Sequence, residues 1–289
     1  MHTIENDLLR LQIDPVGAEL ASVFKKSTQQ EYMWQGDPNI WGSQAPVLFP
    51  IIGGLKEGTY FFNDTAYQLP KHGFIRYNQR LKVDQQSPTK VSFSLESNAE
   101  TLAMYPFRFY FEVAFELIEN KIQVSHVVKN EDTQSLYFSL GGHPAFNCPL
   151  KDDENYEEYY ITLADGKEQQ SHLLSNTGLI QKDSITVFEE GKIQLTDTLF
   201  DHDALIFKGI HAKEATLHHQ TKGAVLKMNF EDFPDLGIWA KPKAPFVCIE
   251  PWLGHADVVD TTQKLEEKAG IQTLDQGQTH TSTYSITIF

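Results

Sequence analysis

The chain has 289 residues, a formal net charge of -15 at pH 7, 40% hydrophobic residues and 22% charged residues. This composition is that of a globular protein long enough to bury a substantial core. The strong negative charge disfavours nucleic acid and anionic membranes as partners, because like charges repel. The N-terminus lacks a basic region followed by an apolar run, and no stretch approaches the roughly 18 apolar residues of a membrane span, so we expect a cytoplasmic protein.

Alternation of apolar and polar side chains dominates the chain and predicts β-strands. In chain order, such runs cover residues 91–95, 107–117, 121–128, 135–140, 159–163, 224–230, 246–250 and 283–289. The longest, 107–117, places phenylalanines on one face and charged or polar side chains on the other, as in a half-buried strand. Strands this dense, joined by short polar turns, predict an all-β fold in which antiparallel sheets form a large β-sandwich.

Helical patterns are few and short. Residues 98–104 predict one or two helical turns stopped by Pro106, and residues 262–268 predict another ended by Gly270. The acidic run 151–158 has the composition of a solvated loop, and strand-like sequence resumes directly after it. We therefore expect one domain covering residues 1–289.

Three ionisable residues lie beside glycine, proline or an aromatic ring at the edge of apolar stretches: His72, His143 and Glu250. An imidazole can give a proton near pH 7 and a carboxylate can take one. Glu250 ends the predicted strand 246–250, and partial burial there would raise its pKa toward the range of a general base. Only a folded sheet could bring the three together. The alternative is structural: loop histidines bonded to carbonyls and a strand-end glutamate in a turn.

Aromatic residues are dense near these segments. They are Trp34, Trp41, Phe74, Phe146, Trp239 and Trp252. Sugars present apolar C–H faces that stack on such rings, so a carbohydrate site is compatible with this pattern. The alternative is that the rings fill the sandwich core.

Other chemistry has little support in the sequence. His218 and His219 are adjacent and would face opposite sides of a strand, so they do not predict a metal site. Cys148 and Cys248 are expected to be buried free thiols. Neither a phosphate-binding glycine loop nor a serine-hydrolase motif is present. We predict no metal and no cofactor.

Taken in order and spacing, five segments give the chain a strong resemblance to the aldose 1-epimerase (galactose mutarotase-like) family and its LacX-like branch. They are residues 45–53, 71–76, 141–147, 203–207 and 245–252. The resemblance covers almost the whole chain. It implies the galactose mutarotase-like supersandwich and an enzyme that interconverts the α and β anomers of an aldose without a cofactor.

The resemblance also implies roles for individual residues. Glu250 would be the general base and His143 the general acid, with His72 holding sugar oxygens. Asp203 would bind sugar hydroxyls, although Asp201 is a rival for that position. Trp239 is a further expected sugar-binding residue.

The chain departs from the family at Gly54, where the family pattern carries an arginine that reaches the sugar. Arg76 or Lys56 could take over, although lysine does not replace a bidentate arginine. Two alternatives to the epimerase therefore stay open: a non-catalytic sugar-binding or regulatory protein, and a hexose-6-phosphate 1-epimerase. The latter would need a phosphate site such as one built from Arg76, Lys56 and Lys241.

Overall fold

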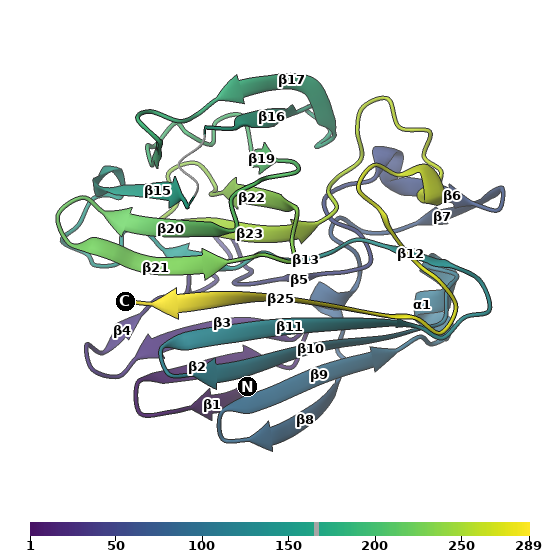
Figure 1. The fold of residues 1–289 in the computed structure, drawn as a ribbon, viewed down its shortest axis with the longest axis horizontal. Coiled ribbons are helices and arrows are strands. Elements are labelled where there is room, and N and C mark those ends of the chain that lie inside the picture. Colours follow the sequence, from purple (N-terminus) through teal and green to yellow (C-terminus); the bar gives the residue numbers. More distant parts are fainter. Residues whose placement is uncertain (165–167) are drawn as a thin grey trace.

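Two large antiparallel sheets form the centre of the computed structural model, which describes residues 1–164 and 168–289 (Figure 1). The nine-stranded sheet contains, in spatial order, β18 (Lys192–Gln194), β15 (Tyr159–Leu163), β20 (Glu214–His219), β21 (Gly223–Asn229), β25 (Thr279–Ile288), β11 (Lys121–Asn130), β10 (Phe109–Ile118), β9 (Lys90–Glu96) and β8 (Lys82–Ser87). The eight-stranded sheet contains β17 (Ile180–Thr186), β16 (Gln170–Leu174), β19 (Leu205–Phe207), β22 (Asp235–Trp239), β23 (Phe246–Leu253), β13 (Leu140–Gly142) and β5 (Val47–Leu48), with β14 (Ala145–Asn147) also paired to β23.

Smaller sheets and short helices complete the described residues. A four-stranded sheet contains, in spatial order, β1 (His2–Glu5), β2 (Leu9–Asp14), β3 (Glu19–Lys25) and β4 (Gln30–Glu31). Two further sheets have two strands each: β6 (Thr59–Phe62) with β7 (Thr65–Gln68), and β12 (Leu136–Phe138) with β24 (Gln272–Leu274). The helices are α1 (Ala99–Met104) and the 3-10 turns η1 (Lys56–Gly58), η2 (Ile75–Tyr77), η3 (Tyr156–Glu158) and η4 (Leu265–Glu267). This is the predicted all-β supersandwich with few short helices. In the described ranges, no helix is long and apolar enough to cross a membrane.

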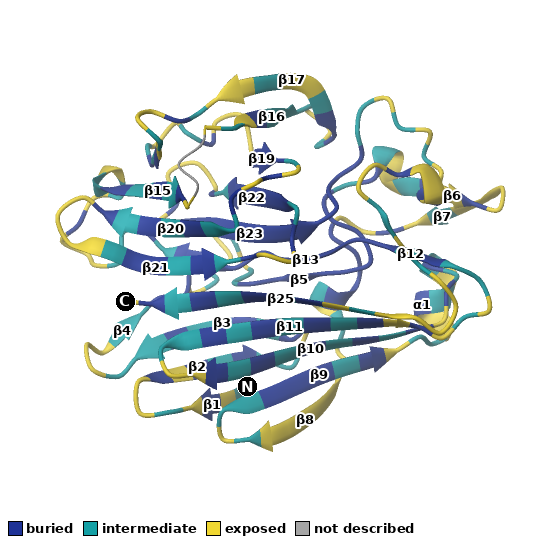
Figure 2. Ribbon diagram, viewed as in Figure 1, coloured by how far each residue is buried: buried dark blue, intermediate teal, exposed yellow. Residues whose placement is uncertain are grey.

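Side-chain alternation builds the core, as predicted for residues 107–117. Along β10 every second residue is buried, which Figure 2 shows as alternating colours. Phe49, directly after β5 of the eight-stranded sheet, lies with its ring centroid 5.3 Å from that of Phe109 and 4.9 Å from that of Phe111 in β10. These aromatic contacts join the two large sheets.

Two predicted strands differ from the structure. Residues 135–140 do not form one strand, because the chain changes sheets: β12 pairs with β24, whereas β13 joins the eight-stranded sheet. The backbone N–H of Ser139, between them, donates instead to the Pro50 carbonyl at 2.7 Å. The strand expected to end at Glu250 continues to Leu253, because its register with β22 runs on through Trp252. Glu250 is therefore an interior strand residue.

The helix predicted over 98–104 is confirmed. The Asn98 side chain accepts from the backbone N–H groups of Glu100 and Thr101, and the Thr101 side chain caps Asn98 in return. Over 262–268 the structure has only the 3-10 turn η4.

The packing of β10 predicts that two adjacent residues contribute very differently to the free energy of unfolding. Phe115 is buried, whereas the Glu116 side chain is 35% exposed and pairs with Lys90 at 3.0 Å. We expect Phe115→Ala to lower the free energy of unfolding by about 3–5 kcal/mol and Glu116→Ala to change it by at most about 1 kcal/mol. Urea denaturation of both variants checks this, and equal losses would contradict the assigned faces of β10.

Candidate active site

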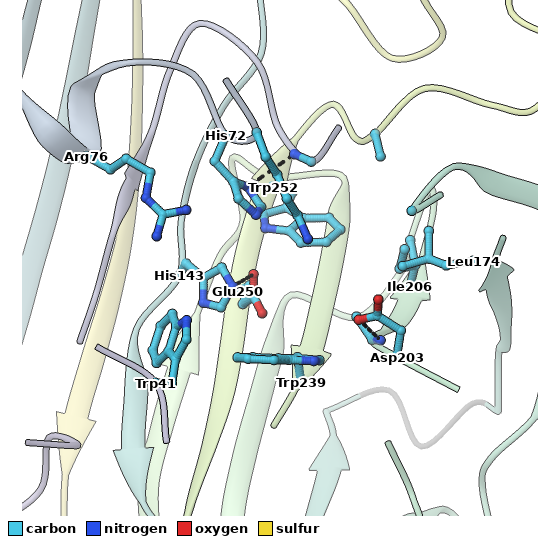
Figure 3. A pocket seen from close by; sticks show the side chains of 15 residues that line it. Trp41, His72, Arg76, His143, Leu174, Asp203, Ile206, Trp239, Glu250 and Trp252 are labelled. Atoms are coloured by element: carbon cyan, nitrogen blue, oxygen red, sulfur yellow. Dashed lines mark hydrogen bonds and ion pairs between the residues drawn. The ribbon is translucent and has the colours of Figure 1, made fainter. Parts of the chain in front are cut away.

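A cavity of ≈ 350 Å³ is lined by residues of the eight-stranded sheet and of the loops beside it (Figure 3). All six side chains predicted from the sequence line it: His72, Arg76, His143, Asp203, Trp239 and Glu250. They come from segments separated by up to 178 positions (250 − 72) in the sequence. Pairing of β13, β22 and β23 within one sheet brings His143, Trp239 and Glu250 together. The segment of His72 and Arg76 lies outside this sheet and is held against the residues after β5 by backbone hydrogen bonds.

Glu250 and His143 meet because β13 and β23 are neighbours. Glu250 lies within β23, and His143 is the first residue after β13. The backbone N–H of His143 donates to the Pro46 carbonyl at 3.1 Å, which holds the chain as it leaves the strand. As a result, the Nε2 atom of His143 lies 3.2 Å from the Oε2 atom of Glu250.

Gly237, the cross-strand partner of Glu250 in β22, has no side chain and so makes room for a neighbouring ring on this face of the sheet. A β-carbon at Gly237 would lie 2.6 Å from the ring of Trp252, so the indole occupies the space that a side chain would fill. Glu250 and Trp252 alternate with inward-facing residues and project from the same side of β23. Both line the cavity.

The acid–base pair is deeply buried. Glu250 is 1% exposed and His143 is 8% exposed. Burial raises the pKa of Glu250 well above its ordinary value, and the nearby Lys71 cation opposes this shift only in part. Burial lowers the pKa of His143 to about 3, with a smaller contribution from the positive charge of Arg76.

No well-aligned hydrogen bond compensates for this burial within the described part of the chain, although the nearby indole N–H of Trp252 opposes the raised pKa of Glu250 in part. Neither carboxylate oxygen of Glu250 has a hydrogen-bond partner there, and neither does Nδ1 of His143. The Glu250–His143 contact is close in distance but not aligned as a hydrogen bond. Such unpaired buried polar atoms are costly for a fold, and where they line a cavity they are candidates for groups that act on a ligand.

His72 is held in one tautomer by the loop at Gly53. Its Nδ1 accepts a hydrogen bond from the backbone N–H of Gly53 at 3.1 Å, which leaves the ring proton on Nε2. Burial lowers the pKa of His72 well below its ordinary value, with the proximity of His143 as a second cause. His72 is therefore a neutral imidazole, and its ring lies edge-on to His143 with centroids 5.6 Å apart.

Aromatic rings surround His143. The ring of Trp41 stacks on it with centroids 5.1 Å apart, and Trp239 contacts it edge-on at 5.7 Å. Trp41 and Trp239 also contact each other at 5.5 Å. Together with Trp252 they give the cavity apolar faces suited to the C–H faces of a sugar.

Charged groups lie on both sides of Glu250, with Arg76 and Asp203 on opposite sides of it in Figure 3. Arg76 donates from Nη2 to the Ser43 hydroxyl at 3.1 Å, while its buried Nε has no partner among the described residues. Asp203 accepts from the Ala204 N–H at 2.8 Å and is otherwise exposed. Asp203, and not Asp201, is a lining residue.

Two lysines considered from the sequence lie elsewhere. Lys56 donates to the Val259 carbonyl and Lys241 donates to the Ile40 carbonyl. Neither lines the cavity, so the phosphate site of Arg76, Lys56 and Lys241 that a hexose-6-phosphate epimerase would need does not form there.

Sequence reasoning missed Lys71 as a lining residue, along with the apolar Leu174 and Ile206. Lys71 could have been inferred, because it precedes His72 directly in a glycine-containing loop. The apolar pair gave no signal that distinguishes a cavity wall from a core. Trp41 and Trp252 were noted only as nearby aromatics.

Gly53 and Gly54 differ in the space around them. Gly53 has φ +67°, and a β-carbon there would lie 2.4 Å from the Cβ of Ala256. Gly54 has no heavy atom within 4 Å of such a position, so there is room for a side chain where the resemblance leads us to expect an arginine. Beneath this loop, Asp257 accepts from the Lys56 N–H at 2.9 Å and forms a buried ion pair with Lys268 at 2.9 Å.

Comparison with known proteins identifies the family of this chain. The profile of the family described as Aldose 1-epimerase matches residues 1–287. The chain belongs to this family.

Similar proteins cover the whole chain. Two LacX proteins of Lactococcus lactis subsp. lactis, plasmid and chromosomal, are each 32% identical over 99% of this chain and 98% of their own length. A galactose mutarotase related enzyme from Lactobacillus acidophilus superposes with a TM-score of 0.95 at 34% identity, covering 100% of this chain and 97% of its own. A galactose mutarotase-like protein from Lactobacillus casei ATCC 334 superposes with a TM-score of 0.93 at 32% identity, covering 100% of both chains.

The two glycines allow a matched test of the loop that holds His72. We expect Gly53→Ala to lower the free energy of unfolding by about 1–3 kcal/mol, because it combines a left-handed backbone with a clash against Ala256. Gly54→Ala meets open space and should change stability by at most about 0.5 kcal/mol. Thermal denaturation compares them, and a tolerant Gly53 would contradict the close approach of this loop to residue 256.

Proposed function

We propose that this protein is an aldose 1-epimerase that interconverts the α and β anomers of a free or modified aldose. The observation that carries the proposal is the buried pair of Glu250 and His143, 3.2 Å apart on the wall of a cavity lined by tryptophans. Membership of the aldose 1-epimerase family supports a sugar as the substrate.

In the proposed reaction, Glu250 takes the proton of the C1 hydroxyl while the C1–O5 bond breaks and O5 takes a proton from His143. The C1 oxygen becomes an aldehyde oxygen. Rotation about the C1–C2 bond presents the other carbonyl face, O5 adds to it, and both protons return. The bonds and protons balance, so the cycle needs no oxidant and no group donor.

This cycle requires one proton on the Glu250–His143 pair. Burial opposes the charged form of each residue, so in the free site the proton belongs on Glu250 beside a neutral His143. Transfer of that proton to His143 gives the carboxylate base and the imidazolium acid that ring opening uses. The polar oxygens of a bound sugar favour this charged form.

Other lining residues have proposed roles in binding. His72, fixed by Gly53, is proposed to donate from Nε2 to a sugar oxygen, and Asp203 is proposed to accept from sugar hydroxyl groups. Arg76 is proposed to replace the family arginine that is missing at Gly54. Trp239 is proposed to stack on the sugar.

Polarimetry of freshly dissolved α-D-glucose and α-D-galactose tests the reaction. We expect the wild-type protein to accelerate mutarotation and Glu250→Gln to lose about 10²- to 10⁴-fold in rate, because a positioned acid or base contributes that much. The variant should keep its fold and its sugar binding, which circular dichroism and saturation-transfer NMR measure.

The pH dependence of the rate tests the shared proton. We expect a bell-shaped kcat/KM profile. The rate falls on the acidic side when a second proton binds to His143, at a pH near its pKa of about 3. It falls on the alkaline side when the pair loses its proton through the raised pKa of Glu250. A break near the ordinary histidine pKa of about 6.5 would contradict this assignment.

A modified, anionic aldose is a second candidate substrate, favoured by one observation: Lys71 and Arg76 both line the cavity. Activity on a hexose 6-phosphate without activity on the free sugar would support it. Sugar binding without turnover of either kind would instead support the non-catalytic alternative suggested by Gly54.

A further inference from the structure

Three ligand atoms of different chemistry lie close together, two of them on residues that line the cavity. The sulfur of Cys248, a ring nitrogen of His143 and a carboxylate oxygen of Glu250 all lie within 4.8 Å of one another. Cys248 and Glu250 are two positions apart on β23 and therefore share a face of the sheet. All three side chains are buried, and Cys248 is 0% exposed.

The cysteine has no assigned task in the proposed epimerase reaction. Cys248 is a free thiol, and the proton transfers described above use only Glu250 and His143. Glu250 adds a second, independent feature, because both of its oxygens are buried without hydrogen-bond partners in the described ranges. A buried carboxylate of this kind, next to a thiol and an imidazole, is poised to accept a cation.

We propose that Cys248, His143 and Glu250 form an inhibitory binding site for a divalent cation of the zinc class. Zinc prefers cysteine sulfur, histidine nitrogen and carboxylate oxygen at about 2.0–2.3 Å, so its ligand atoms lie roughly 3.3–3.8 Å apart. The three atoms here need to close by roughly an ångström, within the reach of side-chain rotation.

The charge of the three ligands favours a divalent cation, whereas the positive charges of Lys71 and Arg76, which also line the cavity, oppose it. A thiolate and a carboxylate beside a neutral imidazole carry two negative charges, which a divalent cation neutralises. The resulting buried cluster has no net charge, which avoids the cost of an uncompensated charge in the interior. Binding releases the thiol proton, and the proton of Glu250 where present, to solvent, so it strengthens as pH rises.

The cation inhibits, if the proposed function holds, because it occupies both proton-transfer groups. The metal-bound oxygen of Glu250 cannot take the C1 hydroxyl proton, and the metal-bound nitrogen of His143 cannot give one. A sugar competes for the same place, so inhibition is competitive with substrate.

Cobalt(II) titration of the reduced protein tests the site without relying on activity. A bound cobalt ion that has a thiolate ligand gives a charge-transfer absorption in the near ultraviolet. Because the chain has only two cysteines, Cys148 and Cys248, we compare wild type with Cys248→Ala and the matched control Cys148→Ala. Cys248→Ser serves as the second variant in case the alanine variant does not fold.

We expect the absorption in wild type and Cys148→Ala, its displacement by zinc, and its loss in the Cys248 variants. No absorption in the folded wild-type protein, or one that persists without Cys248, would overturn the proposal.

Zinc inhibition of mutarotation is the second readout. We expect loss of Cys248 to weaken inhibition by at least roughly 100-fold. Even residues that only hydrogen-bond to a metal ligand, without touching the metal, contribute about 10- to 100-fold to metal affinity. The Cys148 variant should be inhibited as wild type is.

The two readouts separate the metal site from the proposed function. A cobalt signal in a protein without epimerase activity would support the metal site and overturn the proposed function. Epimerase activity without a cobalt signal would support the proposed function and overturn the metal site. Inhibition that does not depend on Cys248 would overturn the proposed site.

Discussion

The site depends on one costly constraint, the burial of the Glu250 carboxylate in the interior of β23 without a hydrogen-bond partner among the described residues. Such a group lowers the stability of the fold, and proteins accept this cost where function requires it. The surrounding sheet makes it possible. Gly237 on the neighbouring strand makes room for the indole of Trp252, and β13 brings His143 to 3.2 Å from the carboxylate.

The two histidines of the cavity are controlled in different ways. His72 is fixed by a backbone N–H, which sets its tautomer and makes it a donor. His143 has no such anchor on its ring among the residues that the structure describes, and its unpaired Nδ1 there and close contact with Glu250 suit it to exchange protons. The chain thereby separates a binding imidazole from a proposed reacting one, although burial lowers the pKa of both.

Much of the fold and site could be predicted from the sequence, because alternation along strands such as 107–117 directly encodes which face is buried. The capped helix at 99–104 was equally local. The strand predicted at 135–140 was wrong because the change of sheet at Ser139 depends on Pro50, far away in the sequence. The end expected at Glu250 was wrong because pairing with β22 carries the strand past Pro251. The six predicted site residues do line one cavity, but the distance between Glu250 and His143 is a property of strand register that no local pattern contains.

The most direct test of the central claim is a 13C NMR titration of the glutamate side-chain carboxyl groups, with Glu250→Gln used to assign the Glu250 resonance. The account predicts that Glu250 titrates well above the ordinary range for glutamate, as burial without a partner requires, and that a bound sugar changes its titration. A Glu250 that titrates near the ordinary value of about 4.3 would mean that water or another partner solvates the carboxylate. In that case the buried pair would not be the centre of the site.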